Sequence, residues 1–373
     1  MVMTMRDSIS KAKRIVIKIG SSSLTGKAGS GLDASAVDKL VDVVAATKKN
    51  GAEVLVVSSG AIAAGLAPLG LQSRPKDLST QQAAASVGQG LLIHRYTESF
   101  ARYGITASQV LLTTTDVVRR SHYSNAQRAL FKLLSLGVVP VINENDTVGT
   151  SEIRFGDNDR LAALVALLIQ ADLLIVVSDI DALYDAPPTE PGAKKISEVK
   201  SLDELSNIKL GGAGTGVGSG GMVTKIEAAR IATSAGTTML LTSAKELERA
   251  INGEDCGTLF QARDNKSSAR ALWLAHASAS SGKLILDDGA VKALIEKSVS
   301  LLPEGVTAVE CTFDAGETVD LVDKNGRVIA RGIVNFDSDE LPQMLGRSTK
   351  ELAMTLGAEF ERELVHRDDL VIL

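Results

Sequence analysis

A glycine-rich segment followed by a threonine and a lysine is the part of the sequence that points most directly to chemistry. Seven glycines lie between Gly211 and Gly221, and Thr224 and Lys225 close the run. Glycine lets the backbone turn several N–H groups toward one point, and the helix expected from Ile226 adds the positive end of its dipole. With the charge of Lys225, this pattern predicts a site for the phosphates of a nucleotide. The alternative is a flexible linker, which is not usually followed by an amphipathic helix that bears a lysine.

Polar residues also occur at the carboxyl ends of expected β-strands, where α/β sheets bind ligands. Lys18 lies inside the apolar run of residues 14–19, directly before a Gly-Ser-Ser-Ser turn. Its position favours a ligand contact, and the alternative is a lysine that extends its ammonium group to the edge of the sheet. Ser58 begins a small-residue turn after the next strand, and Ser178 and Asp179 follow the buried run LLIVV. An ordinary N-cap and a surface turn are the alternatives at these two places.

The densest polar cluster occupies two segments, residues 143–146 and 154–160. Amide groups and carboxylates in combination can hold the ammonium and carboxylate groups of a small amino acid, and carboxylates can orient lysines against phosphate charge. One side chain could instead cap the helix expected from Arg160. A single cap does not account for Asp157, Asn158 and Asp159 together.

Short β-rich runs alternate with segments of helical periodicity through the first two thirds of the chain. Strands are expected at residues 14–19, 54–57, 106–112, 138–142, 173–177 and 238–241. Helices are expected after the Asp33 cap up to residue 50, and at residues 81–103, 125–136 and 160–170. This alternation implies parallel pairing with crossover helices on both faces. The sequence therefore predicts an α/β fold, a three-layer αβα sandwich with a mainly parallel central sheet.

The pattern changes after about residue 275. The small, polar stretch HASASSG is typical of a linker, so we expect a first domain at 1–275, a linker at 276–281 and a small, mainly β domain at 282–373. Asn325-Gly326 lies between two apolar runs and predicts a type I′ hairpin. Residues 283–373 carry 10 basic and 18 acidic side chains, so the acidity of the chain is concentrated in this module.

Composition narrows the class of protein. The 373 residues are 45% hydrophobic but 3% aromatic, which predicts a large aliphatic core, and the net charge of −5 argues against a nucleic-acid partner. Cys256 and Cys311 lack CxxC spacing and are expected to be reduced thiols of a cytoplasmic protein. No signal peptide and no membrane span are expected, because no sufficiently long apolar run occurs. The four histidines are isolated, so no protein-held metal site is expected.

Six motifs, in this order along the chain, resemble those of the amino acid kinase family, and within it those of the members that phosphorylate glutamate. They are IVIKIGSSSLT (15–25), VSSGAIAAG (57–65), VINENDTV (141–148), RFGDND (154–159), SDIDALY (178–184) and GTGVGSGGMVTK (214–225). The resemblance runs from about Lys13 to the C-terminus, and its acidic motifs are more specific than the glycine run. The C-terminal module is similar to a PUA domain, a β fold known from RNA-modifying enzymes.

The resemblance implies roles for individual residues. Lys18 and Lys225 would stabilise the transferring phosphoryl group, and Asp159 would hold these lysines in place. The residues implied to bind glutamate are Ser58, Asn143, Asp146, Asp157 and Asn158. The residues implied to bind ATP are Lys18, Ser178, Asp179, Ser219, Gly220, Gly221, Met222, Val223, Thr224 and Lys225. No definite role is implied for Arg154.

The implied activity is ATP-dependent phosphorylation of the side-chain carboxylate of L-glutamate to L-glutamyl 5-phosphate, the first step of proline biosynthesis from glutamate. The cofactors would be ATP and Mg²⁺, with the metal held mainly by the phosphates of ATP. The resemblance also implies feedback inhibition by proline, a homo-oligomer and hand-over of the acyl phosphate to a reductase. No nucleic-acid or membrane partner is expected, and this expectation comes from the net charge and from the lack of a long apolar run.

Two other functions stay open at this point. The first is a kinase of a different acid, acetylglutamate, aspartate or carbamate, against which the motifs NENDTV and FGDND argue. The second is an RNA-binding protein that uses the PUA-like module, against which the intact lysine pair and the acidic module argue.

Overall fold

The chain forms two compact units, Met1–Lys266 and Ser267–Leu373. We describe them from a computed structural model that covers residues 5–26, 31–113, 116, 120–148, 158–207, 221–262, 274, 280–297 and 299–373. The linker expected at 276–281 falls mostly outside these described residues. Each unit has its own buried cluster of aliphatic side chains.

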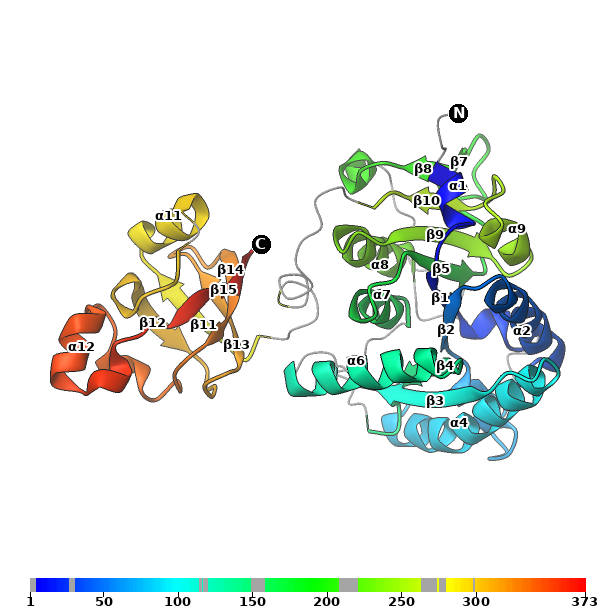
Figure 1. Ribbon diagram of the computed structural model, residues 1–373, viewed down its shortest axis with the longest axis horizontal. Helices are drawn as coiled ribbons and strands as arrows, with labels where there is room; N and C mark the ends of the chain where they lie inside the picture. Colours follow the sequence, from blue (N-terminus) through cyan, green and yellow to red (C-terminus); the bar gives the residue numbers. More distant parts are fainter. Residues whose placement is uncertain are drawn as a thin grey trace. The chain divides into compact units, whose positions relative to one another are not determined.

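An eight-stranded sheet forms the centre of the first unit (Figure 1). Its strand order is β3 (Ala107–Leu112), β4 (Val139–Glu144), β2 (Glu53–Ser58), β1 (Arg14–Ile19), β5 (Leu173–Ser178), β9 (Thr238–Ser243), β10 (Thr258–Phe260) and β8 (Glu198–Val199). The pairs from β3 to β9 are parallel, and β10 runs antiparallel to β9. The chain builds β2, β3 and β4 on one side of β1 and then crosses to β5 on the other side, so the topological switch point lies at β1.

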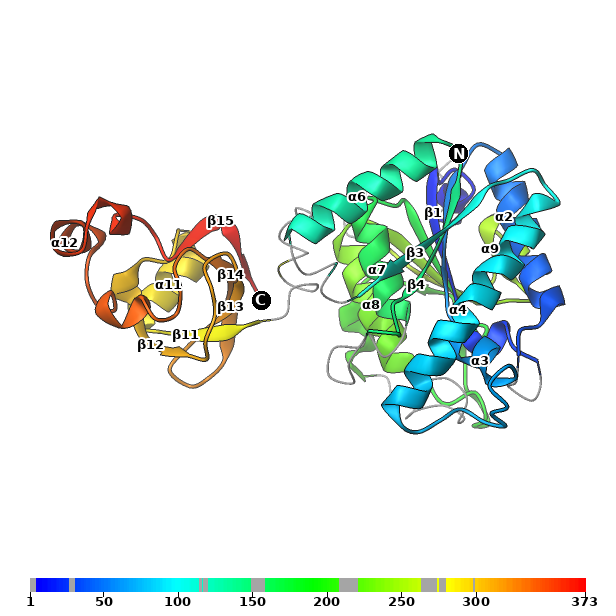
Figure 2. The same ribbon diagram turned by 90° about the horizontal axis from the view of Figure 1, so that it is seen from below.

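Helices cover both faces of this sheet, as expected for parallel strands with crossover connections. Figure 2 shows α6 (Arg120–Ser135), α7 (Asn158–Leu168) and α8 (Met222–Ser234) on one face, and α2 (Ala34–Lys49), α4 (Leu78–Ala101) and α9 (Leu247–Ile251) on the other. The remaining elements of the unit are α1 (Met5–Ile9), α3 (Ala61–Leu66) and the small hairpin of β6 (Leu183–Tyr184) and β7 (Lys195–Ile196). The predicted three-layer αβα sandwich is confirmed.

Side-chain alternation along β1 decides which face each residue serves. Ile15, Ile17 and Ile19 belong to the cluster that packs under α2 and α4. Lys18 therefore lies on the opposite face, which α7 and α8 cover. Lys18 interrupts an apolar run in the sequence, and the sheet directs its side chain to the face where Asp159 of α7 pairs with it.

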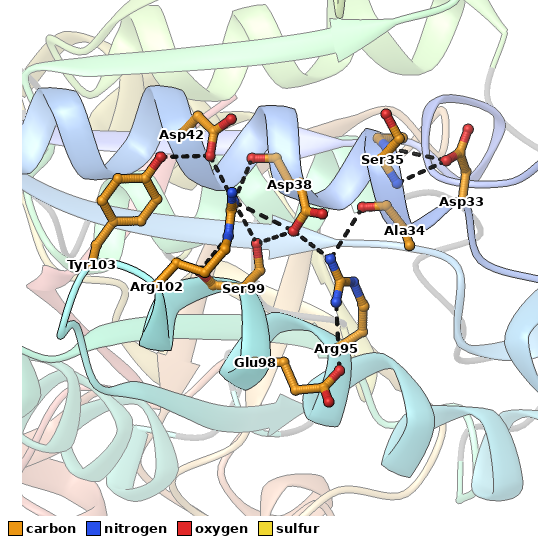
Figure 3. Close-up of polar contacts among 11 residues, drawn as sticks. Asp33, Ala34, Ser35, Asp38, Asp42, Arg95, Glu98, Ser99, Arg102 and Tyr103 are labelled. Carbon is orange, nitrogen blue, oxygen red and sulfur yellow. Dashed lines mark hydrogen bonds and ion pairs between the residues drawn. The ribbon is translucent and has the colours of Figure 1, made fainter.

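Helix α4 is fixed from two directions. Figure 3 shows it joined to α2, where Asp38 accepts hydrogen bonds from Ser99 and Arg95, and Asp42 accepts them from Arg102 and Tyr103. On its other side α4 packs against α3 at two glycines. A β-carbon on Gly88 would lie 1.8 Å from the Ala61 carbonyl oxygen, and one on Gly65 would lie 1.9 Å from the Ala84 carbonyl oxygen. Only glycine permits this separation of the two helices.

The second unit is built on a five-stranded sheet in the order β12 (Val306–Glu310), β11 (Gly282–Leu286), β13 (Thr318–Val322), β14 (Val328–Val334) and β15 (Val365–Ile372). The helices α11 (Asp288–Lys297) and α12 (Thr349–Thr355) accompany it. Only the β11–β13 pair is parallel among these neighbours. The prediction of a mainly β module is confirmed.

The turn between β13 and β14 differs from the predicted type I′ hairpin. Gly326 has a φ of +81°, whereas Asn325 does not have the positive φ that type I′ requires. The Asp323 side chain instead accepts hydrogen bonds from the backbone N–H groups of Asn325 and Arg327. The Gly326 N–H bonds to the Asp323 carbonyl, and the Asp323 N–H bonds to the Arg327 carbonyl, so a loop with a left-handed glycine closes the hairpin.

Several helices begin at residues other than those predicted. Helix α4 begins at Leu78, because the Asp77 side chain caps it by accepting a hydrogen bond from Thr80 N–H. Helix α8 begins at Met222, so Thr224 and Lys225 lie within its first turns and not before it. The strands β8 and β10 were not predicted, since two or three residues carry too little pattern.

Candidate active site

Three charged side chains from three elements meet at the carboxyl end of β1. The Lys18 ammonium group lies 2.5 Å from Asp159 Oδ1, and the Lys225 ammonium group lies 3.1 Å from Asp159 Oδ2. Lys18 is 4% exposed, Lys225 5% and Asp159 0%. Burying charge is unfavourable unless the groups are paired, so Asp159 fixes both ammonium groups in place. The predicted trio of Lys18, Lys225 and Asp159 is thus brought together.

The start of α8 adjoins this trio. Thr224 Oγ1 lies 3.3 Å from Asp159 Oδ2 and donates to the Gly221 carbonyl at 2.8 Å. The N-cap of α8 is Gly221, which has no side chain to cap the helix. Among the described residues no side chain caps the first N–H groups of α8, which begin at Met222. Such a terminus suits an anion. The other predicted phosphate contacts, Ser219 and Gly220, lie outside the described residues.

A chain of amide groups crosses the ends of β2 and β4. Asn158 Nδ2 donates to the Ser58 carbonyl at 3.0 Å, to Ser59 Oγ at 2.9 Å and to Asn143 Oδ1 at 2.9 Å. Asn143 Nδ2 in turn donates to Gln89 Oε1 at 2.8 Å. The predicted residues Asn143 and Asn158 are therefore in direct contact, although they are fifteen positions apart in the chain.

Ser58 and Ser59 face different surroundings. Ser58 has the same parity in β2 as Val54 and Val56, so its side chain enters the core beneath α4. Its hydroxyl lies 2.9 Å from the Tyr96 hydroxyl in a buried contact. Burial raises the pKa of Tyr96, which therefore keeps its proton. Ser59 instead contacts the Asn158 amide, and strand alternation could have distinguished these two serines in advance.

Of the other residues considered for the substrate site, the described part of the chain includes Asp146 alone. Asp146 lies half-buried in the turn after β4, and this turn is held to the neighbouring strand by the hydrogen bond from Asn145 N–H to the Leu112 carbonyl at 2.9 Å. Asp157 and Arg154 lie outside the described residues. Their predicted roles stay predictions.

A cavity of about 490 Å³ opens beside the end of β5. Its lining includes the predicted residues Ser178 and Asp179, together with Ser23, Ile180, Asp181, Pro188, Ser243, Ala244 and Lys245. These residues come from the ends of β5 and β9 and the loops that follow, which is where an α/β sheet binds ligands. The contributions of Ser243 and Lys245 were not predicted, because nothing in their local sequence marks them.

Asp181 is held at the rim of this cavity. Tyr184 donates to Asp181 Oδ1 at 3.0 Å, and Lys195 donates to Oδ2 at 3.3 Å. Burial opposes ionisation of Asp181, but these hydrogen bonds and the Lys195 charge outweigh it and keep the pKa of the carboxyl below its usual value. The small β6–β7 hairpin thereby presents an ionised carboxylate to the cavity.

Neither metal-binding clusters nor membrane spans occur in the described residues. No group of three or more histidine, cysteine, aspartate or glutamate side chains is placed there to hold a metal ion. Both carboxylate oxygens of Asp159 face ammonium groups. No helix in this part of the chain has the length and apolar character that crossing a bilayer requires.

The sequence of the first unit matches a family model. The model for the amino acid kinase family matches residues 13–243, more than half of the chain. The chain belongs to the amino acid kinase family. A model for the PUA domain matches residues 282–355, within the second unit.

Curated relatives match over nearly the whole chain. A protein of Streptomyces coelicolor named glutamate 5-kinase is 59% identical over 99% of this chain and 98% of its own length. A protein of Thermobifida fusca with the same name is 56% identical over 99% of this chain and 95% of its own length. Among solved structures, the carbamate kinase from Giardia lamblia bound to AMP-PNP covers 68% of this chain and 100% of its own, with a TM-score of 0.51 and 18% identity. At this identity the likeness concerns the fold alone.

Proposed function

We propose that this member of the amino acid kinase family transfers the γ-phosphoryl group of ATP to the side-chain carboxylate of L-glutamate. The products are L-glutamyl 5-phosphate and ADP, and the reaction is the first step of proline biosynthesis from glutamate. Full-length relatives named glutamate 5-kinase support the substrate. The observation that carries the chemistry is the pair of buried lysines held on Asp159 at the carboxyl end of β1.

The reaction needs positioning and charge neutralisation more than proton transfer. A side-chain carboxyl with a pKa of about 4.3 is ionised near pH 7, so the nucleophile needs no general base. It must approach the γ-phosphoryl group in line, although both carry negative charge. Lys18 and Lys225 neutralise the charge that spreads over the transferring oxygens, and Asp159 keeps both ammonium groups in position.

We place glutamate at the ends of β2 and β4. In the described part of the chain, Asn158 Oδ1 receives no hydrogen bond, so it can accept one from the substrate ammonium group. Asp146 and Asp157 would add carboxylates for the same cation. Asn143 orients Asn158, and Ser58 contributes its carbonyl to the Asn158 amide. The Ser59 hydroxyl is better placed for substrate than that of Ser58, whose hydroxyl contacts Tyr96.

We place the nucleoside of ATP in the cavity lined by Ser178 and Asp179. The phosphates would then extend toward the α8 N-terminus, where the segment Ser219–Lys225 supplies backbone N–H groups and the Lys225 charge. Mg²⁺ held on the phosphates would neutralise further charge during transfer. Since Asp159 faces two ammonium groups, we expect the phosphates, and not this carboxylate, to hold the metal.

Further partners follow from family membership and stay proposals. Proline would inhibit by binding at or overlapping the glutamate site, and the labile acyl phosphate would pass to a reductase. The protein would form a homo-oligomer through its kinase unit. The PUA domain is not expected to bind RNA, because this module is strongly acidic.

Formation of glutamyl hydroxamate tests the proposed function. Purified protein with ATP, Mg²⁺, hydroxylamine and L-glutamate should form the hydroxamate, and proline should reduce its formation. Acetylglutamate, aspartate and carbamate in place of glutamate test the alternative kinases, which the names of the relatives do not favour. Preference for one of these acids over glutamate would contradict the proposal.

A further inference from the structure

Helix α4 carries two polar side chains that reach the ends of two central strands. Gln89 and Tyr96 lie two turns apart on the buried face of the helix. Gln89 Oε1 accepts from the Asn143 side chain at the end of β4, and the Tyr96 hydroxyl contacts Ser58 at the end of β2. Neither residue belongs to a sequence motif that pointed to the site, yet both contact residues that build it.

Backbone groups fix the direction of the amide chain from Gln89 to Asn158. Asn143 Oδ1 accepts the Glu144 backbone N–H at 2.8 Å, so this atom must be the oxygen of its amide. Asn158 Nδ2 faces the Ser58 carbonyl, so this atom must be the nitrogen. Exchanging oxygen and nitrogen in either amide would place like groups against each other. The Asn143 nitrogen is therefore turned to Gln89 and requires an acceptor there.

The amide chain ends at Asn158 Oδ1, an acceptor that receives no hydrogen bond from the described residues. All the recorded hydrogen bonds of the Asn158 side chain, within the described residues, leave through its nitrogen. We propose that Gln89 is a positioning residue that acts through Asn143 to hold Asn158 with its oxygen toward the ammonium group of the amino acid substrate. This inference rests on the proposed function, because it assumes that Asn158 contacts glutamate.

The hydrogen bonding of Gln89 itself supports a requirement for its oxygen. Gln89 is 8% exposed, and its buried Nε2 has no hydrogen-bond partner among the described residues. An unpaired buried donor destabilises the fold, and an aliphatic side chain would avoid this penalty. A glutamine at this position is explained if Asn143 needs the Gln89 oxygen as acceptor.

The rest of α4 holds Gln89 rigidly enough for this role. Gly88, its neighbour, packs on the Ala61 carbonyl of α3, the helix that follows Ser59 and Gly60. Ser99 and Arg95 tie the same helix to Asp38 of α2 (Figure 3). A hydrogen-bonding chain that starts from a helix packed against α3 on one side and bonded to α2 on the other can set the orientation of an amide more precisely than a loop residue could.

Replacement of Gln89 tests the proposal by separating substrate binding from catalysis. Gln89→Met keeps the size of the side chain but removes the acceptor, and Gln89→Leu is a second apolar replacement should the first variant fail to fold. We expect the KM for glutamate to rise about tenfold, on the scale of one hydrogen bond to a charged group. The kcat and the KM for ATP should stay within about twofold of the wild type. Gln89→Glu keeps an acceptor for Asn143 and should restore the glutamate KM to within about threefold.

Two controls distinguish the proposal from a general effect of α4. Ser99→Ala removes a partly buried hydrogen bond of the same helix on the side facing α2, and it should lower the melting temperature without changing the KM for glutamate. The second control is the double variant Gln89→Met with Asn158→Ala. If Gln89 acts through Asn158, the double variant should have the same glutamate KM as Asn158→Ala alone.

The outcomes of these experiments distinguish failure of the positioning role from failure of the proposed function. Additive effects in the double variant, or an unchanged glutamate KM in folded Gln89→Met, would overturn the positioning role while leaving the kinase intact. A wild-type protein that formed no glutamyl hydroxamate would overturn the proposed function itself. Equal changes in the glutamate KM and the ATP KM would show a general structural role for Gln89 and would also overturn the proposal.

Discussion

Asn158 and Asp159 are consecutive residues in the first turn of α7, and their side chains organise two different groups. Asn158 holds the ends of β2 and β4 through Ser58, Ser59 and Asn143. Asp159 holds Lys18 and Lys225. One helical turn thus fixes the distance between the proposed amino acid site and the proposed phosphoryl site. In-line transfer requires this kind of fixed separation, because a small misplacement of the reacting groups is costly.

Lys225→Ala should greatly reduce turnover while leaving the protein folded. The loss of one electrostatic contact to the transition state costs about 3–4 kcal/mol, which is about 10²–10³-fold in kcat. Lys18→Ala should behave similarly. Hydroxamate assays at saturating ATP and glutamate measure the effect, and Lys49→Ala, at an exposed lysine of α2, is the matched control. Near-normal turnover of the Lys225 variant would remove the glycine-rich segment from the phosphate site.

Asn158→Ala and Asp146→Ala should act mainly on glutamate. We expect a higher glutamate KM and little change in the ATP KM, because the proposed contacts are to the amino acid. Proline inhibition should change in the same variants if proline and glutamate share these contacts. Initial rates over a grid of both substrate concentrations provide the measurement. An unaltered glutamate dependence in both variants would exclude these residues from the substrate site.

Separate replacement of Ser58 and of Ser59 tests which of these two serines contacts the substrate. Ser59→Ala should raise the glutamate KM, because its hydroxyl contacts the Asn158 amide beside the proposed substrate. Ser58→Ala should instead lower stability by about 1 kcal/mol, the typical value of one buried hydrogen bond, through loss of its contact with Tyr96. Urea unfolding and glutamate kinetics of the two variants distinguish these effects. If Ser58→Ala raised the glutamate KM and Ser59→Ala only lowered stability, Ser58 and not Ser59 would be the serine that contacts the substrate.

The sequence could predict the αβα sandwich, because buried parallel strands leave a strong pattern, whereas the lysine–aspartate trio was implied by the resemblance to the amino acid kinase family. It could not predict Gln89 or Tyr96 as neighbours of the site. Both belong to a long helix whose place over β2 and β4 depends on tertiary packing. Ser58 was assigned from its motif, although the alternation of Val54, Val56 and Ser58 would have turned its hydroxyl toward the core.

The ion pairs between α2 and α4 should make the free energy of unfolding depend on pH in the acidic range. The Ser99 hydroxyl, followed by the charges of Arg95 and Arg102, keeps the pKa of Asp38 below its usual value against the opposing effect of burial. Because the folded pKa is the lower one, this contribution is present above the unfolded pKa of about 3.9 and is lost as pH falls through the folded value. Asp38→Asn should therefore destabilise the protein near pH 7 and less at low pH. Melting temperatures measured across acidic pH would show this convergence, and parallel curves would contradict it.

Removal of the second unit should leave glutamate kinase activity in place. Every residue proposed for catalysis lies at or before Lys225, and the two units have separate buried cores. A chain that ends near Ser280 should therefore fold and form glutamyl hydroxamate, although its proline inhibition or oligomeric state can change. A folded but inactive truncation would contradict this.

The same unit should not bind RNA. Nucleic-acid affinity comes mainly from phosphates neutralised by lysine and arginine, and residues 283–373 carry 18 acidic against 10 basic side chains. Its likeness to the PUA domain concerns fold, and binding has to be argued from the surface itself. Lys283 and Lys324, two of its basic side chains, are moreover paired with Glu310 and Asp288. A gel-shift titration of the full chain with structured RNA at physiological salt should show no complex, whereas tight, salt-dependent binding would mean that a local basic surface outweighs the net charge.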